Sequence, residues 1–259
     1  MKTKTTTLVA ILATSVASFA GTTVKTASVE TTEPSYSGFY GINAMSSYIN
    51  KGKQIDKNQI FQPFAAINVP TKLELAGVKS SVVLETRQNL HTEKNFSVWA
   101  RSEVNAGILL SKDRFSLLTT YELVTSPNKS FDHSEGVNFT LSFDDHGLAP
   151  ISLNPRAKAY VGVKSGFEPL GNYYEVGVAP AFSAGKTTVS FPVNLGVGSK
   201  NYYKDNERYG YSSVGVSTVT PVFKNTSLVA GVNFLNTNEK INAGKKDFWM
   251  TSAGLVVSF

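Results

Sequence analysis

The feature that most constrains this chain is a strict two-residue alternation in its last segment. Trp249, Thr251, Ala253, Leu255, Val257 and Phe259 occupy every second position, with an aromatic at each end of the series. Successive side chains of a β-strand point to opposite faces, so these residues share one largely apolar face. At about 3.3 Å per residue and a tilt near ~40°, the series spans roughly 25 Å, the height of the lipid-facing band of a membrane barrel.

The same alternation recurs along most of the chain. Regular examples are residues 96–108, 136–143, 156–164, 174–182, 189–198 and 228–234, and less regular ones are 35–49, 60–69, 73–85, 115–124 and 209–219. With the last segment this makes about twelve strands, an even number, as bacterial single-chain barrels require. The fold class predicted is therefore all-β: a transmembrane, antiparallel, up-and-down β-barrel.

The connections between these segments differ in length in an ordered way. Long polar loops are predicted on the external side at 50–59, 86–95, 125–133, 165–172, 199–208 and 236–247. Periplasmic turns are predicted at 70–71, 112–114 and 183–186, with longer ones at 144–150 and 220–226. A soluble β-sandwich is the alternative fold, because it shows the same alternation. It does not predict this order of loop lengths or aromatics at strand ends.

The beginning of the chain has the pattern of a secretory signal peptide. Lys2 and Lys4 precede an apolar stretch at 8–19, and small residues at 18 and 20 suit cleavage before Gly21. We therefore expect a signal peptide over residues 1–20, a flexible Thr-rich lead-in over 21–35, and the barrel over 36–259. A short N-terminal helix of the folded domain is the alternative. Export through the periplasm to the outer membrane of a Gram-negative bacterium is the predicted localisation.

Composition excludes several classes of protein. The chain has no cysteine, so neither a disulfide scaffold nor a thiolate nucleophile is available. No apolar run of eighteen residues follows the signal peptide, and no RNA-binding or zinc-finger spacing occurs. No nucleic-acid partner is expected. The modest excess of Lys and Arg suits lipopolysaccharide phosphates outside the barrel or anionic solutes within it. The last strand is expected to engage the barrel-assembly machinery.

Charged residues on the polar strand faces are predicted to line the lumen. The candidates are Arg101, Glu103, Glu122, Arg156, Lys158, Lys164 and Glu175. Arg156, Lys158 and Lys164 would form a positive ladder on one strand and give a weak preference for anions. The alternative is that opposite charges pair across strands and fill the centre of the barrel.

Aromatic residues near the predicted strand ends are expected to anchor the barrel at the membrane interfaces, where one end of the ring is dry and the other wet. The chosen anchors are Tyr36, Tyr40, Tyr48, Trp249 and Phe259.

Sequence patterns do not favour an enzyme. The histidines are His91, His133 and His146, all in predicted loops or turns, and no Gly-x-Ser-x-Gly motif occurs. Residues 144–146 combine two aspartates with a histidine, but an acidic turn is the commoner explanation. Hence no catalytic residue, metal site or cofactor is expected.

Residues 44–69 resemble the opening of the TorF-like porins. Tyr48 ends the first strand, Lys51 and Gly52 begin a polar loop, and Gln62 and Pro63 open the second strand. Residues 95–145 and 171–182 are similar to the middle hairpins of that family. The resemblance implies an outer-membrane, porin-like barrel and no catalytic or binding residues.

Two functions follow as expectations. The first is a porin-like channel for passive diffusion of small hydrophilic solutes or ions. The second is a non-conducting barrel with a structural or surface-interaction role through its external loops.

Overall fold

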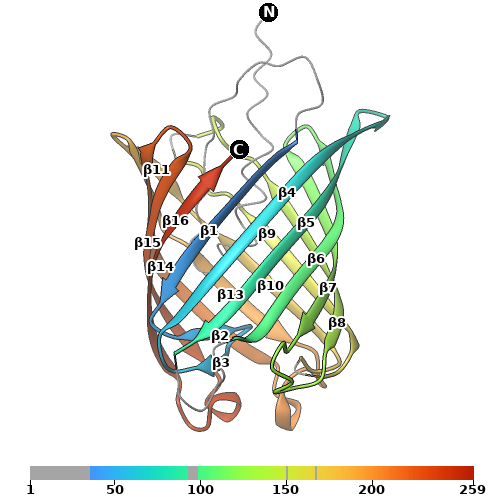
Figure 1. Ribbon diagram of the computed structural model, residues 1–259, viewed down its shortest axis with the longest axis vertical. Helices are drawn as coiled ribbons and strands as arrows, with labels where there is room; N and C mark the ends of the chain where they lie inside the picture. The colour runs from blue at the N-terminus through green and yellow to red at the C-terminus, as the bar shows by residue number, and fades with distance from the viewer. Residues whose placement is uncertain (1–35, 93–98, 150, 167) are drawn as a thin grey trace, which may run out of the picture.

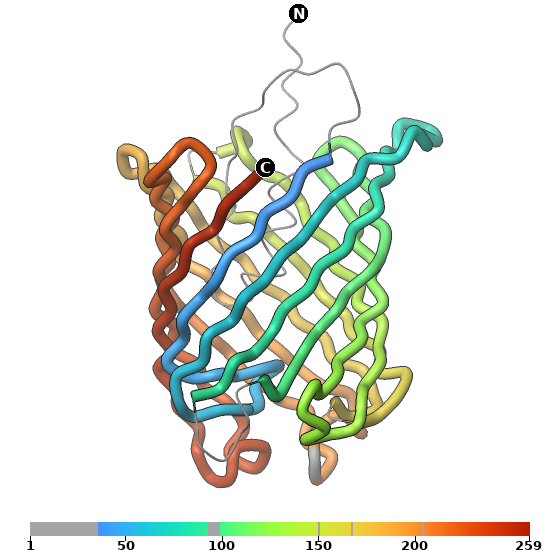
Figure 2. Tube along the Cα trace, in the orientation of Figure 1, coloured from blue at the N-terminus to red at the C-terminus, as the bar shows by residue number. Residues whose placement is uncertain are grey.

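The chain folds into a closed antiparallel β-barrel (Figures 1 and 2). The computed structural model describes residues 36–92, 99–149, 151–166 and 168–259. The predicted signal peptide (1–20) and the whole of the predicted lead-in (21–35) lie outside these residues. The strands are β1 (Ser37–Met45), β2 (Tyr48–Asn50), β3 (Lys53–Asp56), β4 (Ile60–Leu75), β5 (Val78–His91), β6 (Trp99–Lys112), β7 (Phe115–Thr125), β8 (Ser134–Phe143), β9 (Arg156–Lys164), β10 (Asn172–Val178), β11 (Ala181–Ala184), β12 (Thr187–Ser190), β13 (Val193–Gly198), β14 (Tyr209–Phe223), β15 (Thr226–Thr237) and β16 (Asp247–Ser258). Two short 3₁₀ turns, η1 (Lys204–Asn206) and η2 (Glu239–Asn242), lie in loops.

Twelve strands form the wall, because two of them are interrupted. β10 and β11 follow one another along the wall, as do β12 and β13, and Pro180 and Pro192 lie at the two breaks. Proline has no N–H to donate to a ladder, so it interrupts strand pairing. The sheet stays joined at these points, since Phe191 N donates to Pro180 O (2.8 Å) and Gly215 N donates to Pro192 O (2.9 Å). The predicted twelve-stranded barrel is confirmed.

Pairing of β1 with β16 closes the cylinder. Their ladder runs from Phe39 opposite Ser258 to Met45 opposite Ser252. Beyond it, Gly38 and Phe259 exchange two backbone hydrogen bonds of 3.0 Å each. The Phe259 ring lies so near Gly38 that a Cβ there would be 2.6 Å from Phe259 Cζ. Glycine at this position therefore leaves room for the Phe259 ring beside the seam.

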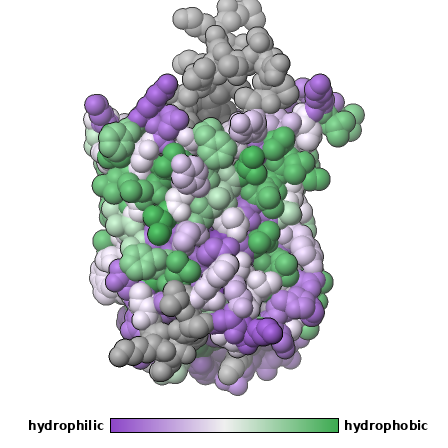
Figure 3. All heavy atoms as spheres, in the orientation of Figure 1, coloured by the Kyte–Doolittle hydropathy of each residue, from purple (hydrophilic) through white to green (hydrophobic). Residues whose placement is uncertain are grey.

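The outer face of the barrel is largely apolar, and its inner face carries both polar and apolar side chains. On β16, Leu255 and Trp249 face outward and are exposed, whereas Met250 faces inward and is buried. Figure 3 shows hydrophobic side chains over the wall and hydrophilic ones gathered at the lower rim, where the long loops lie. A closed sheet leaves no unpaired backbone edge, which lipid requires of a spanning structure. Among the described residues, no helix is long and apolar enough to cross a membrane.

A charge placed halfway up the outer wall should be costly. Val232 lies near the middle of β15, opposite Val216 and Thr251, and its side chain is exposed. We expect Val232→Arg to lower the free energy of unfolding by about 2–4 kcal/mol, because it places a guanidinium in hydrocarbon. Urea unfolding of the barrel in liposomes measures this. Phe223→Arg, at the exposed end of β14, should cost only about 0–1 kcal/mol. Equal losses for the two variants would contradict a lipid-facing wall.

Three predicted connections were misplaced. The turn predicted at 220–226 is only residues 224–225, since β14 continues to Phe223 and β15 begins at Thr226. The turn predicted at 70–71 lies inside β4, which continues to Leu75, and the chain reverses at Ala76 and Gly77, both with positive φ. Such a pair suits a tight hairpin turn. The loop predicted at 86–95 begins only after His91. Residues 86–91 are mostly polar, which is typical of a loop. They belong to β5, and their side chains alternate between the lumen and the outer wall.

Candidate functional site

The first external loop folds into the barrel instead of away from it. Residues 46–59 carry β2 and β3, which pair as a small hairpin across the lower end of the barrel (Figure 1). We call Tyr48–Asp56 the inner hairpin. Tyr48 is only 2% exposed and Ile49 is 0% exposed. Both side chains pack in an apolar cluster with Leu235, Phe248 and other lumen residues. Burial of these two side chains stabilises the inward position of the loop.

Hydrogen bonds fix the tip of the inner hairpin to the surrounding wall. Tyr203 donates its hydroxyl to Lys51 O (2.7 Å), and Asn242 Nδ2 donates to Gly52 O (2.8 Å). Gly52 has a φ of +84°, and a Cβ there would lie 2.7 Å from Gly210 O. Only glycine allows the backbone to approach β14 this closely.

The far end of the inner hairpin is tied to β5. His91 Nδ1 lies 2.5 Å from Asp56 Oδ2, and both side chains are almost completely buried. Asp56 also accepts a hydrogen bond from the backbone N–H of Asn58 (2.8 Å). The hairpin is thus held at both ends, so it fills the mouth as a fixed element.

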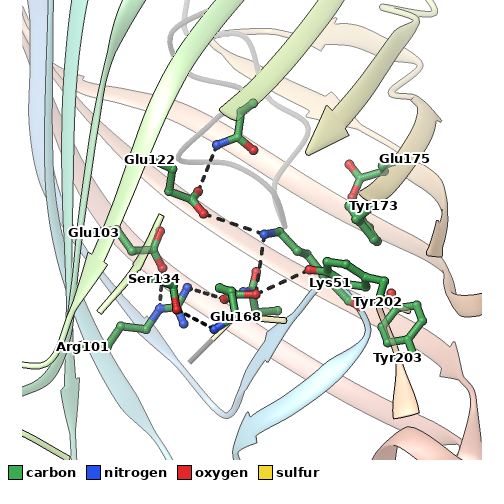
Figure 4. A network of polar contacts seen from close by, with 12 residues as sticks. Lys51, Arg101, Glu103, Glu122, Ser134, Glu168, Tyr173, Glu175, Tyr202 and Tyr203 are labelled. Atoms are coloured by element: carbon green, nitrogen blue, oxygen red, sulfur yellow. Dashed lines mark hydrogen bonds and ion pairs between the residues drawn. The ribbon is translucent and has the colours of Figure 1, made fainter. Parts of the chain in front are cut away.

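Charged side chains from the wall converge on the lumen side of the inner hairpin (Figure 4). Arg101 is 2% exposed, and its Nε donates to Glu103 Oε1 (2.7 Å) while its Nη2 donates to Glu168 Oε1 (2.9 Å). Tyr48 donates its hydroxyl to Glu103 (3.1 Å), and Arg87 Nη1 lies 3.7 Å from the same carboxylate. Each carboxylate is matched by a cation, which such burial requires.

Glu168 comes from the loop between β9 and β10 and reaches into this cluster. Its backbone N–H donates to Ser134 Oγ (2.8 Å), and its carboxylate accepts from Asn50 Nδ2 (2.8 Å). Burial raises the pKa of the Glu168 carboxyl, but Lys51 and Arg101 outweigh it and leave that pKa below its ordinary value. Glu168 is therefore ionised at neutral pH.

Lys51, at the tip of the inner hairpin, lies in the middle of the mouth. Its Nζ is 3.8 Å from Glu122 and 3.7 Å from Glu168, and it stands 3.5 Å above the centre of the Tyr160 ring. In Figure 4 the Lys51 side chain points between the two carboxylates. This lysine links the hairpin to both β7 and the β9–β10 loop.

Farther round the wall, β9 and β10 carry a second charged group. Glu175 lies 3.9 Å from Arg156 and 3.6 Å from Lys158, and it accepts hydrogen bonds from Tyr173 (2.9 Å) and Tyr211 (2.5 Å). The two basic residues of β9 therefore face a carboxylate on the neighbouring strand. One carboxylate thus compensates half of the positive charge of these two residues.

Two cavities lie on either side of the hairpin tip. A lumen cavity of about 120 Å³ lies on its periplasmic side and is lined by Glu103, Glu122 and Lys158 among others. An outer vestibule of about 480 Å³ lies on its external side, among the long loops, and is lined by Glu168, Tyr202 and Tyr203 among others. Asn50 and Lys51 line both. The tip of the inner hairpin is therefore the partition between the two spaces.

Further toward the periplasm, one side of the lumen is apolar. Phe39, Phe64, Val83, Leu109 and Leu118 are buried in a cluster on the inner faces of β1 and β4–β7. The other side, on β12–β15, presents Ser190, Asn194, Ser217 and Asn233. The lumen is thus polar around only part of its circumference at this level.

Six of the seven predicted pore-lining residues lie on the inner face. These are Arg101, Glu103, Glu122, Arg156, Lys158 and Glu175. Lys164 differs, because a β-bulge between Glu135 and Gly136 shifts the register and places Lys164 opposite Glu135. Its side chain is exposed and its Nζ lies 2.5 Å from His133 Nε2. The bulge therefore turns Lys164 away from the face that carries Arg156 and Lys158.

Four of the five predicted aromatic anchors lie on the outer face of the barrel, and one lies inside it. Tyr36, Tyr40, Trp249 and Phe259 are exposed, and the Phe259 ring lies 6.3 Å from both Tyr36 and Tyr40. Tyr48 is buried inside the barrel instead, because it belongs to the inner hairpin.

Sequence reasoning missed Lys51, Glu168, Glu85 and Arg87. Lys51 and Glu168 lie in polar segments that look like ordinary external loops. Glu85 and Arg87 alternate with the outward Leu84 and Thr86, so the two-residue period could have identified them. Within the described residues, no group of three or more His, Asp or Glu side chains is placed to hold a metal ion.

Comparison with known proteins supports the fold. No family model matches the chain, and no curated protein matches it. An outer membrane channel from Pseudomonas putida F1 is similar in structure, with a TM-score of 0.51, 11% identity, and coverage of 86% of this chain and 94% of the other. The chain has the fold of an outer-membrane β-barrel. At this identity the likeness extends to the fold alone.

Other solved structures are similar at lower scores. The NanC porin gives a TM-score of 0.49 and 10% identity over 85% of this chain and 98% of that one. The outer membrane phospholipase A from Escherichia coli gives 0.49 and 10% identity over 85% and 92%.

Proposed function

We propose that this chain is an outer-membrane channel for passive diffusion of small hydrophilic solutes or ions. The observation that carries the proposal is a group of charged side chains in the lumen of a barrel whose outer face is largely apolar. Charged side chains line the lumen cavity, and the outer vestibule shares the hairpin tip with that cavity. Charges of this kind are costly inside a barrel unless they are paired or meet water and solute. No cofactor is needed for diffusion.

Conduction through this barrel should be small and weakly selective. Twelve strands lie between barrels whose interior is filled by side chains and wide, water-filled porins. The inner hairpin narrows the lumen further. Both signs of charge are present in the lumen, and Glu175 beside Arg156 and Lys158 weakens the preference for anions that two cations alone would give.

A non-conducting barrel with a surface role is the second candidate. The burial of Tyr48 and Ile49 in the mouth favours it, since the hairpin leaves only a small cavity beneath. In this case the external loops would carry the function.

Planar-bilayer recording of the folded protein separates the two. We expect stable conductance steps far below those of sixteen-stranded porins, with a reversal potential near zero in a salt gradient. Heat-modifiability on a gel controls for folding, because folded and boiled barrels migrate differently. An absence of steps over many insertions of folded protein would favour the non-conducting barrel.

The remaining expectations stay proposals. We infer membership of the TorF-like porins from Tyr48, Lys51, Gly52, Gln62 and Pro63, and a signal peptide from residues 1–20. Lipopolysaccharide around the outer rim and assembly machinery at β16 are the proposed partners. Pull-down of the unfolded chain, with and without residues 247–259, tests the second of these.

A further inference from the structure

We propose that Glu122, Glu168 and Tyr160 form a binding site for the ammonium group of a small primary amine, which Lys51 occupies in the closed barrel. We call these three residues the ammonium pocket. The proposal builds on the proposed function, since it names a class of solute for the channel. It also gives the inner hairpin a role as a tethered competitor for that solute.

The contacts of Lys51 define the chemistry of the pocket. Its Nζ faces two carboxylates at 3.7–3.8 Å and the face of an aromatic ring at 3.5 Å. A cation between carboxylates and a π-face is favoured by charge and by the ring quadrupole, most strongly where water is excluded. The same surroundings repel an anion. The pocket therefore recognises a primary ammonium group.

The backbone of Lys51 adopts a conformation that is unfavourable for a lysine. Lys51 has a φ of +49°, in the left-handed region that glycine and asparagine adopt most readily. A lysine at such a position is disfavoured by its backbone. Its side-chain contacts offset that cost.

Tyr160 is fixed in place without the help of Lys51. It is 2% exposed, and its ring packs on Gly136, where a Cβ would lie 2.2 Å from Tyr160 Cε2. The ring also makes an edge contact with Tyr202, with centroids 6.2 Å apart. The Tyr160 hydroxyl is buried and has no hydrogen-bond partner among the described residues. The ring therefore keeps its face toward Lys51 by packing alone.

Both carboxylates are also held from outside the pocket. Asn138 Nδ2 donates to Glu122 (3.1 Å), and Arg101 Nη2 donates to Glu168 (2.9 Å). Within the described residues, Lys51 is the cation at ion-pair distance from Glu122. Withdrawal of Lys51 would leave the pocket formed, with an uncompensated negative charge at Glu122.

The position of the pocket suits a passing solute. Glu168 and Lys51 line the outer vestibule, whereas Glu122, Tyr160 and Lys51 line the lumen cavity. An amine that moves from one space to the other meets the pocket at the partition. Its ammonium group would replace Lys51 between the same carboxylates.

The direct test is calorimetric titration of the full folded barrel in detergent with propylammonium chloride. Lys51→Gly empties the pocket and relieves the left-handed backbone. We expect this variant to bind propylammonium at least about tenfold more tightly than the parent, because the tethered competitor is gone. Lys51→Gly/Glu122→Gln should lose most of that gain. Lys53→Ala, which removes an exposed lysine from the same hairpin, should bind like the parent.

Lys51→Asn repeats the test with a second residue suited to the left-handed backbone, in case the glycine variant does not fold. Equal binding by the parent and the Lys51 variants, or binding that Glu122→Gln leaves unchanged, would overturn the proposal. The titration needs no membrane, so it is independent of conduction. Amine binding without conductance steps would refute the channel and keep the pocket, whereas steps without amine binding would do the reverse.

Discussion

Replacing residues 47–57 by a short Gly-Ser turn is expected to raise single-channel conductance by roughly an order of magnitude, because the narrowest part of a pore sets its resistance. The replacement removes the inner hairpin and leaves β1 and β4 paired from Met45 and Ile60 onward. It takes Lys51 out of the partition between the outer vestibule and the lumen cavity. The wall keeps its twelve strands, so the barrel should still fold.

Planar-bilayer recording of the variant and the parent measures the effect. The matched control shortens the external loop at 126–131, whose hydrogen bonds among Ser126, Asn128 and Ser130 are internal to the loop. The control should conduct like the parent. Unchanged conductance without the inner hairpin would place the constriction elsewhere, for example at the apolar cluster around Phe64 and Leu118.

Arg101→Met is expected to lower the stability of the barrel strongly, because it breaks buried ion pairs from one side. It removes one cation from Glu103 and from Glu168, and leaves Arg87 and Lys51 as their remaining partners. Breaking a buried ion pair from one side costs about 3–5 kcal/mol, and we expect about 3 kcal/mol here because the lumen cavity admits water. The free energy of unfolding in urea measures the loss.

Two further variants show whether charge is the cause. Adding Glu103→Gln to Arg101→Met should restore part of the stability, since it removes one stranded carboxylate. Arg114→Met changes an arginine at a turn that, among the described residues, binds the backbone oxygens of Asp144 and His146. It should cost less than about 1 kcal/mol. If Arg101→Met and Arg114→Met were equally mild, the lumen cluster would contribute nothing to the fold.

The wall of this barrel follows from the sequence because its signal is local. Each wall strand alternates between lipid and lumen, so Leu255 and Met250 can be assigned to opposite faces from parity alone. The same rule placed Glu103 and Glu122 inside. It failed at Lys164, because a one-residue bulge inverts parity and leaves no mark in the alternation.

The inner hairpin did not follow from the sequence because its burial depends on distant partners. Residues 51–58 are mostly polar and charged, which is typical of an exposed loop. Asn50 nevertheless binds Glu168, 118 positions further along the chain. A local pattern carries no information about such a contact, so Lys51 was overlooked and Tyr48 was assigned to the membrane interface.

The seam between β1 and β16 has a consequence for the order of assembly. Every other pair of neighbouring wall strands is joined by one connection, whereas Gly38 and Phe259 meet from opposite ends of the chain. Hairpins between consecutive strands can therefore form early. The β1–β16 pairing joins the residues that are farthest apart in the sequence, so we expect it to form last. Until then β1 and β16 each expose an edge of unpaired backbone N–H and C=O groups. Such edges promote aggregation in water and cost several kcal/mol per group in lipid. A growing barrel of this design needs those two edges shielded throughout its assembly.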